Sequence, residues 1–514
     1  MAIMNCNNSC EILANKQYPV LFVYKQKGKV VVSTEELKGE KLFFQIPNIT
    51  AQALGNDAFK KDYNVKYAYY GGAMANGIAS ADMVIALGKK GFMGSYGAGG
   101  CSIENLRKEI DKIQKELYNQ EPYMINMLNN RNADMELELA KLLVEKNVPA
   151  VEASAYITIS KALVYYRVQG LSEKNGKIQI PHKIIAKVSR EEVLTKFVMP
   201  PEEKLVKELV KEGLLTEEEA ILSRKISMAD DITVEADSGG HTDGRPLVSM
   251  LPALIALANQ LQEQYQYEKP VRIGAGGGIG TGLSCLGAFE MGASYVVTGS
   301  INQSCVEAGT SDYVKQCLEE TAMADVTMAP CADMFETGAK VEVIKKKTMY
   351  PQNAQKLYEY YVKYASFEEI PEVERQKVEK RILKQPFGQI WESTKQYFAK
   401  VDPRQIARAE ANPKVKMALV FRWYLGNSSR WAVQGEESRK TDMQIWCGQS
   451  MGAFNLWVKN TPLEHRENRY VAEVAELMMQ SAAYQYMKNL CRQIGVSAED
   501  MQEDILQSHF HQIK

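Results

Sequence analysis

Short apolar segments alternate with longer amphipathic segments over the middle of the chain. From about residue 66 onward, each apolar run is short enough for one buried strand and ends in a glycine or a small polar residue. The stretches between them, such as 103–117 and 201–215, place charged residues at helical spacing. Strands that alternate with helices in this way pair in parallel, so the pattern predicts an α/β fold with a parallel sheet.

Eight such runs are present, and eight is the number of strands that closes a barrel. They lie at 66–70, 91–97, 122–126, 148–154, 183–188, 231–236, 271–276 and 294–299. Their span is close to the roughly 250 residues of a (β/α)8 TIM barrel, which carries its chemistry at the C-terminal ends of the strands. An open doubly wound sheet is the alternative, but the glycine fingerprint G-x-G-x-x-G is incomplete, because Thr281 takes the last glycine position after Gly276 and Gly278.

The regions on either side of this pattern differ from it. Segments 19–24 and 29–33 resemble short strands joined by a turn, whereas 350–398 is rich in Lys, Glu, Gln and Tyr with helical periodicity. We therefore expect three regions: a β-rich N-terminal cap over 1–60, the barrel over 61–345, and a helical insertion with a C-terminal subdomain over 346–514.

Composition and charge narrow the class of protein. The chain has 514 residues with 45% hydrophobic and 24% charged residues, which is ordinary for a globular protein and excludes a disordered or collagen-like chain. The formal charge of -1 provides no overall field for nucleic acid or an anionic membrane, so neither is an expected partner. Any phosphate-binding site must therefore depend on a few neighbouring residues and not on the overall charge of the protein.

Cysteine spacing and the apolar segments suggest where the protein works. The nine cysteines form no C-x-x-C pair and no zinc spacing, so we expect a cytoplasmic protein without a metal site. The first fifteen residues contain no Lys, no Arg and no apolar run, which argues against a secretory signal. The most apolar window, 247–258, is about half the length that a bilayer span requires, so no membrane anchor is expected.

Two glycine-rich strand ends, 273–279 and 297–300, are the strongest chemical feature. Glycine lets the main chain approach a phosphate closely, and the loops after the seventh and eighth strands of a barrel form its usual phosphate site. The alternative is that these glycines only serve tight turns. Because both clusters follow the appropriate strands, the sequence favours phosphate binding at Gly276, Gly277, Gly278, Gly299 and Ser300.

Single polar residues end several of the other apolar runs. Asn126, Glu152 and Lys187 would project into the mouth of the barrel, where a lysine can hold a phosphate or stabilise negative charge on a bound ring system. An ordinary rim salt bridge is the simpler interpretation of any one of them. His241 follows the sixth run among glycines, and a proton-exchanging role and a backbone hydrogen bond are equally open there.

The remaining four histidines are expected to have no chemical role. His182 precedes a strand and should be structural. His465, His509 and His511 lie in charged or terminal segments and should be solvated.

Several of these motifs together resemble a known family. The segments 70–80, 94–100, 235–241 and 276–279 are similar to the flavin barrel of nitronate monooxygenases, which also serves flavin-type enoyl-acyl-carrier-protein reductases. Together with 421–426, 429–432 and 444–448, the chain resembles the PfaD family from about residue 54 to 490. Those proteins are trans-acting enoyl reductases of polyunsaturated fatty acid synthases and trans-acyltransferase polyketide synthases.

The resemblance implies FMN as the cofactor and a set of residues that would hold it. The ring would lie against Ala73, Met74 and Ala75, with Asn126 as a contact and Lys187 near the electron-rich edge of the ring. The phosphate would lie at Gly277, Gly278, Gly299 and Ser300. The remaining cofactor contacts implied by the match are Glu152, Glu235, Gly239, Gly240 and Gly276, and the catalytic residues are His241 and Lys187.

The resemblance also implies a reaction and partners. NADPH or NADH would supply the hydride, and the substrate would be an enoyl thioester on an acyl carrier protein domain of a polyketide or fatty acid synthase. Arg422 and Arg430 are candidates for contacting that acidic carrier, and a homodimer stays open. Trp423, Trp431, Trp446 and Trp457 are expected mainly in a core. A nitronate monooxygenase-type oxidase and a non-catalytic flavoprotein scaffold remain as alternatives.

Overall fold

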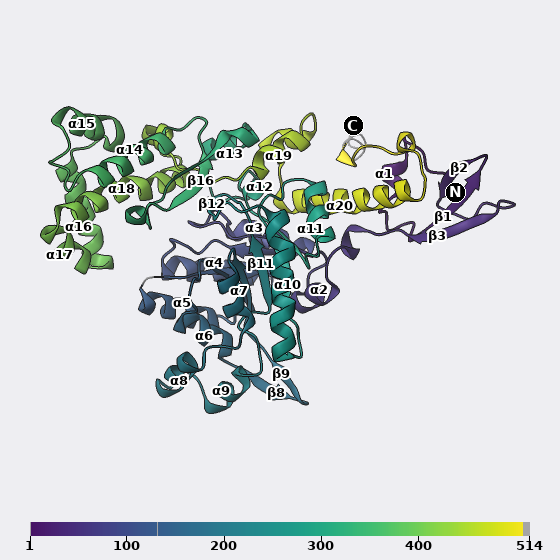
Figure 1. The fold of residues 1–514 in the computed structure, drawn as a ribbon, viewed down its shortest axis with the longest axis horizontal. Helices are drawn as coiled ribbons and strands as arrows, with labels where there is room; N and C mark the ends of the chain where they lie inside the picture. Colours follow the sequence, from purple (N-terminus) through teal and green to yellow (C-terminus); the bar gives the residue numbers. More distant parts are fainter. Residues whose placement is uncertain (1, 131, 507–514) are drawn as a thin grey trace. The chain divides into compact units, whose positions relative to one another are not determined.

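The computed structural model describes residues 2–130 and 132–506 (Figure 1). The chain divides into two compact units. The first comprises Met1–Asp237, Gly244–Ala308 and Ala453–Lys514, and the second comprises Ser238–Asp243 and Gly309–Gly452. The expected boundaries at 60/61 and 345/346 stay a prediction.

Eight parallel strands close into a barrel in the first unit, so the predicted TIM-barrel class is confirmed. The strands are β4 (Tyr69–Gly71), β5 (Met93–Tyr96), β6 (Met124–Leu128), β7 (Ala150–Ser154), β10 (Lys183–Val188), β11 (Asp231–Glu235), β13 (Arg272–Gly276) and β14 (Val296–Thr298). Their order around the barrel is β10-β11-β13-β14-β4-β5-β6-β7. Each of the eight apolar runs overlaps one of these strands.

Helices follow the strands and carry the end signals expected of them. The first unit holds α1 (Ser9–Ile12), α2 (Asp57–Tyr63), α3 (Ala81–Lys90), α4 (Ile103–Glu116), α5 (Ala133–Glu145), α6 (Lys161–Val168), α7 (Glu191–Val198), α8 (Glu203–Lys211), α9 (Glu217–Ser223), α10 (Leu247–Tyr265), α11 (Gly282–Glu290), α12 (Ser300–Gln303) and α20 (Val471–Gln493). Helix α3 shows the local logic: the Ser80 hydroxyl accepts the Met83 N–H at its start, and Gly91, with φ of 85°, ends it in the left-handed conformation.

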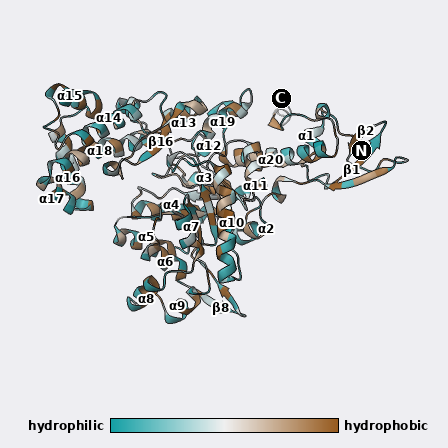
Figure 2. Cartoon of the chain, viewed as in Figure 1, coloured by the Kyte–Doolittle hydropathy of each residue, from teal (hydrophilic) through white to brown (hydrophobic). Residues whose placement is uncertain are grey.

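Helix α10 contains the most apolar window of the sequence. In Figure 2 the end of this helix that begins at Leu247 is brown and its other end is teal. The apolar part buries Leu251, Leu254 and Ala258. Among the described residues, none of the helices is both long enough and apolar enough to cross a bilayer.

Alternation along each strand decides which side chains enter the barrel. On β5, Met93 belongs to the interior cluster, whereas a Cβ at Gly94 would lie 2.9 Å from the Val84 backbone on α3. Ser95 therefore points back into the barrel. The same alternation turns Asn126, Glu152, Lys187 and Glu235, one on each of four strands, toward the interior.

An ion network closes the end of the barrel at which the strands begin. The Arg272 guanidinium donates to both carboxylate oxygens of Asp231, at 2.6 and 2.9 Å, and to Asp62 at 2.7 Å. The Tyr63 hydroxyl also donates to Asp231, at 2.7 Å. Because Asp231 is fully buried, these partners are what make its charge tolerable.

The N-terminal segment forms a small antiparallel sheet of β1 (Val20–Gln26), β2 (Lys29–Ser33) and β3 (Leu42–Pro47), in the order β2-β1-β3. The first two strands match the expected ones, and β3 was not expected. A hairpin of β8 (Ser172–Lys174) and β9 (Lys177–Gln179) lies between α6 and β10 in the sequence.

The second unit joins a three-stranded sheet to a group of helices. The sheet has the order β12-β16-β15, from β12 (Gly240–His241), β15 (Val326–Pro330) and β16 (Lys340–Ile344). The helices are α13 (Asp312–Glu319), α14 (Tyr350–Lys363), α15 (Glu372–Lys377), a π-helix (Val378–Leu383), α16 (Phe387–Val401), α17 (Arg404–Ala411) and α18 (Pro413–Gln434). Helix α19 (Ser450–Trp457) spans the boundary between the units in the sequence.

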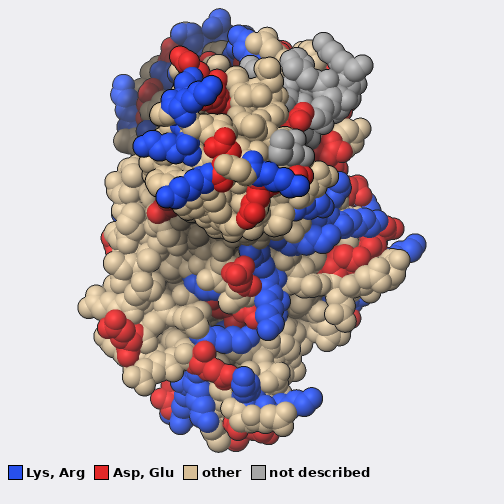
Figure 3. Space-filling model, turned by 90° about the vertical axis from the view of Figure 1, so that its right-hand side faces the viewer, with Lys and Arg blue, Asp and Glu red and all other residues tan. Residues whose placement is uncertain are grey.

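The tryptophan-rich region packs mainly as a core, as the sequence predicts. Trp423, Trp431 and Trp446 are partly buried against a cluster that includes Phe421. The buried Arg439 guanidinium lies 4.3 Å from the centre of the Trp431 ring, a cation–π contact. Charges of both signs are interspersed on the face of the molecule seen in Figure 3.

Removing Arg272 should destabilise the barrel strongly. In Arg272→Met, the fully buried Asp231 carboxyl loses its main partner and must be buried either unpaired or protonated, which costs about 3–5 kcal/mol for a pair of this kind and should lower the thermal unfolding midpoint. The double variant Arg272→Met/Asp231→Asn should recover part of this loss. Arg224→Met, which breaks an exposed ion pair with Glu203 in the same unit, is the control and should unfold like the wild type.

Candidate active site in the mouth of the barrel

A lysine and two glutamates converge at the C-terminal ends of three neighbouring strands. Lys187 Nζ on β10 lies 2.6 Å from Glu235 Oε1 on β11 and 4.0 Å from Glu152 Oε1 on β7. Glu152 is fully buried, whereas the Lys187 and Glu235 side chains keep 18% and 26% of their exposure. We call this set the charged cluster. Its Glu152 side is buried, and its Lys187 and Glu235 side is accessible.

The charges within the cluster hold Lys187 in its ammonium form. Burial disfavours that form, but the carboxylates of Glu235 and Glu152 outweigh burial and raise the pKa of Lys187 above its ordinary value. A fixed positive charge at a strand end can stabilise negative charge on a bound group.

Glu152 also links the cluster to the loop after β4. Its Oε2 accepts the Ala73 N–H at 2.8 Å, and the Tyr70 hydroxyl donates to its Oε1 at 3.3 Å. On the neighbouring strand, the Asn126 side-chain amide donates to the Glu152 carbonyl oxygen at 2.9 Å and to the Ser154 hydroxyl at 3.0 Å. The structure therefore brings together five of the candidate residues: Ala73, Asn126, Glu152, Lys187 and Glu235.

Beneath the cluster lies a column of hydroxyl groups that the sequence interpretation did not identify. The Thr233 hydroxyl lies 3.0 Å from the Tyr70 hydroxyl and 3.1 Å from the Tyr295 hydroxyl. Burial raises the pKa of both tyrosines well above the ordinary value, and the Glu152 charge adds to this at Tyr70. Alternation along β4 and β11, and along the residues that lead into β14, could have revealed these side chains, because they face the barrel interior as the charged positions do.

The loop Ala73-Met74-Ala75 is held against the loop that follows β5. The Ala79 N–H donates to the Met74 carbonyl at 3.1 Å, and the Gly97 N–H donates to the Ala79 carbonyl at 2.9 Å. A Cβ at Gly97 would lie 1.7 Å from the Met74 carbonyl oxygen, so only glycine permits this approach. The candidate ring-binding loop is therefore fixed by its neighbours.

The glycines at the ends of β13 and β14 fall into two groups. Gly276 and Gly277 are packed: a Cβ at Gly276 would lie 3.2 Å from the Thr233 methyl, and one at Gly277 would lie 2.8 Å from the Ala236 and Asp237 backbone. Gly278 and Gly299 face open space, with no atom within 4 Å of an added Cβ. The φ of 90° at Gly277 explains why that position is glycine, since other residues rarely adopt this conformation. At Gly299 the packing would leave room for a side chain. Ser300 begins α12 directly after Gly299.

Ser95 is a further polar residue that the sequence interpretation missed. It is 1% exposed, and its hydroxyl has no hydrogen-bond partner among the described residues. Because it points into the barrel near the end of β5, this hydroxyl is available to a bound molecule. Burying a polar atom without a hydrogen-bond partner costs stability. An unpaired hydroxyl at this position in the barrel mouth is therefore evidence for a ligand.

His241 lies in the second unit, on the edge strand β12. Its Nε2 lies 3.0 Å from Asp333 Oδ1, and its side chain is 50% exposed. The neighbouring glycines serve packing within that unit: a Cβ at Gly239 would lie 2.8 Å from the Cys447 backbone, and Gly240 has a φ of 87° beside Trp446. His182 is buried, with its Nδ1 3.4 Å from the Val148 carbonyl, as expected of a structural histidine. His509 and His511 lie outside the described residues.

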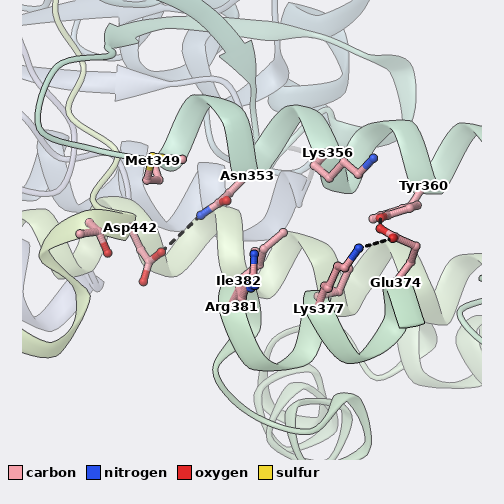
Figure 4. Close-up of a pocket in the computed structure, with 11 residues that line it drawn as sticks. Met349, Asn353, Lys356, Tyr360, Glu374, Lys377, Arg381, Ile382 and Asp442 are labelled. Carbon is pink, nitrogen blue, oxygen red and sulfur yellow. Dashed lines mark hydrogen bonds and ion pairs between the residues drawn. The ribbon is translucent and has the colours of Figure 1, made fainter. Parts of the chain in front are cut away.

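The helices of the second unit line a cavity of about 340 Å³ (Figure 4). Some of its polar side chains pair with each other: Lys377 Nζ lies 2.7 Å from Glu374, and the Asn353 amide donates to Asp442 at 3.4 Å. Figure 4 marks both contacts: the Lys377–Glu374 pair lies within α15, and the Asn353–Asp442 contact joins α14 to the short helix Glu437–Asp442. The residues that line this cavity include none of the candidate catalytic residues.

Comparison with known proteins agrees with this geometry. The nitronate monooxygenase family model matches residues 58–363, more than half of the chain. The chain belongs to the nitronate monooxygenase family. Residues 364–443 match a second model, described as the inserted helical domain of [acyl-carrier-protein] S-malonyltransferase.

This member of the nitronate monooxygenase family resembles proteins of polyketide and polyunsaturated fatty acid synthesis. It is 42% identical over 485 residues to a polyunsaturated fatty acid synthase protein of Thraustochytrium sp., covering 92% of this chain and 32% of that protein. It is 41% identical over 473 residues to the polyketide biosynthesis protein PksE of Bacillus subtilis, covering 92% and 61%. The chain thus spans only part of the length of these curated relatives.

A solved structure matches at the level of the domain. The enoyl reductase domain of MlnA, from the macrolactin biosynthesis cluster of Bacillus amyloliquefaciens, is 40% identical, with a TM-score of 0.82. The match covers 86% of this chain and 99% of that one. The chain is therefore homologous to an enoyl reductase domain, and its homologues are of the oxidoreductase type.

The hydrogen bond from Ala73 to Glu152 gives a testable consequence. Glu152→Ala leaves the partly buried Ala73 N–H without this acceptor and should cost about 1 kcal/mol of stability. Glu152→Gln keeps an acceptor oxygen and should cost less. Thermal unfolding measures both, with the exposed Glu203→Ala as a control that should behave like the wild type. Equal midpoints for Glu152→Ala and Glu203→Ala would contradict the role assigned to this contact.

Proposed function

We propose that this protein is an FMN-dependent enoyl reductase. It reduces α,β-unsaturated thioesters bound to an acyl carrier protein of a polyketide or polyunsaturated fatty acid synthase, acting in trans, with NADPH or NADH as the hydride source. The observation that carries the proposal is the charged cluster at the strand ends, in a chain homologous to an enoyl reductase domain.

The residues of the barrel mouth suit a phosphorylated flavin. The open space at Gly278 and Gly299 accepts a bulky anion near the main chain, and Ser95 offers a hydroxyl that lacks a partner among the described residues. The pinned loop Ala73-Met74-Ala75 would support the ring, and the Lys187 ammonium would balance negative charge on it. When bound, the flavin supplies the hydride chemistry that no side chain can supply.

The other half of the reaction is a proton transfer. Reduction of an enoyl thioester places hydride on the β-carbon and requires a proton at the α-carbon, while negative charge develops on the thioester oxygen. We assign the proton to His241, which follows Glu235 by six positions in the chain. Its exposed ring, 50% accessible, can meet a substrate.

The family itself supplies the second candidate function. A nitronate monooxygenase would oxidise a nitroalkane with dioxygen and need no nicotinamide. The deciding experiment measures nicotinamide oxidation with and without a crotonyl thioester, and oxygen consumption with a nitroalkane. Thioester-dependent nicotinamide oxidation supports the reductase. Oxygen consumption with the nitroalkane alone supports the monooxygenase. If neither assay shows activity, the result supports a non-catalytic scaffold.

Gly278 provides a test of the phosphate position. In Gly278→Val the new side chain fills the open space, so purified protein should contain at least tenfold less FMN. Gly213→Val is a matched control, because Gly213 has a φ of 71° against 72° at Gly278 and equally open surroundings, in the loop between α8 and α9. Both variants carry the same backbone strain, so equal FMN contents would refute the position.

His241→Ala tests the proton donor. The variant should retain bound FMN and its reduction by nicotinamide, while turnover of the thioester falls by about 10²–10⁴, the usual contribution of a general acid. His465→Ala, at an exposed position, should be as active as the wild type. Unchanged thioester reduction by His241→Ala would remove this role.

A further inference from the structure

Strand pairing in the second unit places an aspartate next to His241, although the two residues are far apart in the sequence. β12 pairs antiparallel with β16, with His241 opposite Val341, and β16 pairs on its other side with β15, with Lys340 opposite Pro330. Cys331 and Asp333 follow closely after Pro330. The sheet thus brings Asp333 beside a histidine 92 positions earlier in the chain.

The contact has the geometry of an oriented imidazole. His241 Nε2 lies 3.0 Å from Asp333 Oδ1, and the Cys331 sulfur, the imidazole and the carboxylate offer polar atoms that all lie within 4.8 Å of one another. Cys331 is 1% exposed, whereas the side chains of His241 and Asp333 are 50% and 60% exposed. Asp333 therefore holds the ring at Nε2, and half of the His241 side chain remains exposed.

We propose that Asp333 is a positioning residue for His241: its carboxylate accepts the Nε2–H, orients the ring, and stabilises the imidazolium that supplies the proton to the α-carbon. This inference rests on the proposed function. In the step, a ring N–H bond breaks and an α-carbon C–H bond forms with the electron pair of the enolate. The neutral imidazole left behind regains its proton from water.

Electrostatics agree with this arrangement. Burial alone would lower the pKa of His241, but the hydrogen bonds to Asp333 and Cys331 outweigh burial and raise the pKa to about 10. Burial would raise the pKa of Asp333, but the imidazolium lowers it to about 2. Charged groups on the adjoining segments also include Lys340 and Glu342 on β16, Glu336 between β15 and β16, and Asp243 beyond β12.

The direction of the pH dependence follows from these two shifts. The raised pKa of His241 means that its contribution to folding is complete below its ordinary pKa of 6.5 and is lost as pH rises toward 10. The lowered pKa of Asp333 means that its contribution is complete above 3.8 and is lost as pH falls toward 2. In catalysis, the imidazolium should persist until pH approaches 10.

The experiment measures kcat for a crotonyl thioester against pH in the FMN-loaded full chain. The wild type should lose activity only near pH 10. In Asp333→Asn the alkaline limb should move toward 6.5, because the neutral amide no longer stabilises the cation. We expect a loss of about a hundredfold at pH 8.5 and less than threefold at pH 5.5, with FMN content and KM little changed.

Matched variants separate positioning from structure. Asp333→Glu keeps a carboxylate and should restore much of the alkaline activity. Glu336→Gln removes a nearby carboxylate that pairs instead with Arg422 at 3.0 Å, and it should keep the wild-type profile. An Asp333→Asn profile with an unmoved alkaline limb, or one lowered equally at all pH values, would overturn the proposal.

A direct titration distinguishes failure of the pairing from failure of the proposed function. NMR of the histidine-labelled full chain, with the His241 resonance identified by its loss in His241→Ala, should show titration near pH 10 in the wild type and near 6.5 in Asp333→Asn. Titration near 6.5 in the wild type would overturn the pairing itself. A high pKa together with full activity of His241→Ala would overturn the catalytic assignment, because the proton then comes from another group.

Discussion

An ammonium group held at the edge of a barrel by two carboxylates is the constraint on which the site depends. Lys187 could not stay charged in a largely buried position by itself, since desolvation favours the neutral amine. Glu235 at 2.6 Å and Glu152 at 4.0 Å reverse that preference. Since Glu152 also accepts the Ala73 N–H, the same carboxylate that supports the charge fixes the loop against which a ring would lie.

The two ends of the barrel use buried charge for different purposes. Where the strands begin, Arg272 and Asp231 pair with each other and, through Asp62 and Tyr63, with neighbouring side chains. Where the strands end, the cluster keeps partial exposure, and the Ser95 hydroxyl has no partner within the described part of the chain. Between these ends lies the hydroxyl column of Tyr70, Thr233 and Tyr295. Stability and chemistry are thus separated along the strands, as is usual in this fold.

The sequence predicts the barrel well, because buried parallel strands are continuous apolar runs with polar residues at their ends. The same logic found Asn126, Glu152 and Lys187. It missed β3, in which only Ile46 is buried and the other positions are exposed or half-buried, and the π-helix at Val378–Leu383, which has no pattern of its own. Asp333 was missed because its contact with His241 depends on antiparallel pairing between distant segments, which composition and periodicity do not encode.

The central claim is that the charged cluster serves a flavin that passes electrons from nicotinamide to an enoyl thioester. Anaerobic stopped-flow absorbance near 450 nm tests it most directly. The protein reduced by one equivalent of NADPH should regain its yellow colour when mixed with a crotonyl thioester, with one saturated thioester formed per flavin. If the reduced protein stays colourless with the thioester and recovers only when oxygen is admitted, the account is wrong.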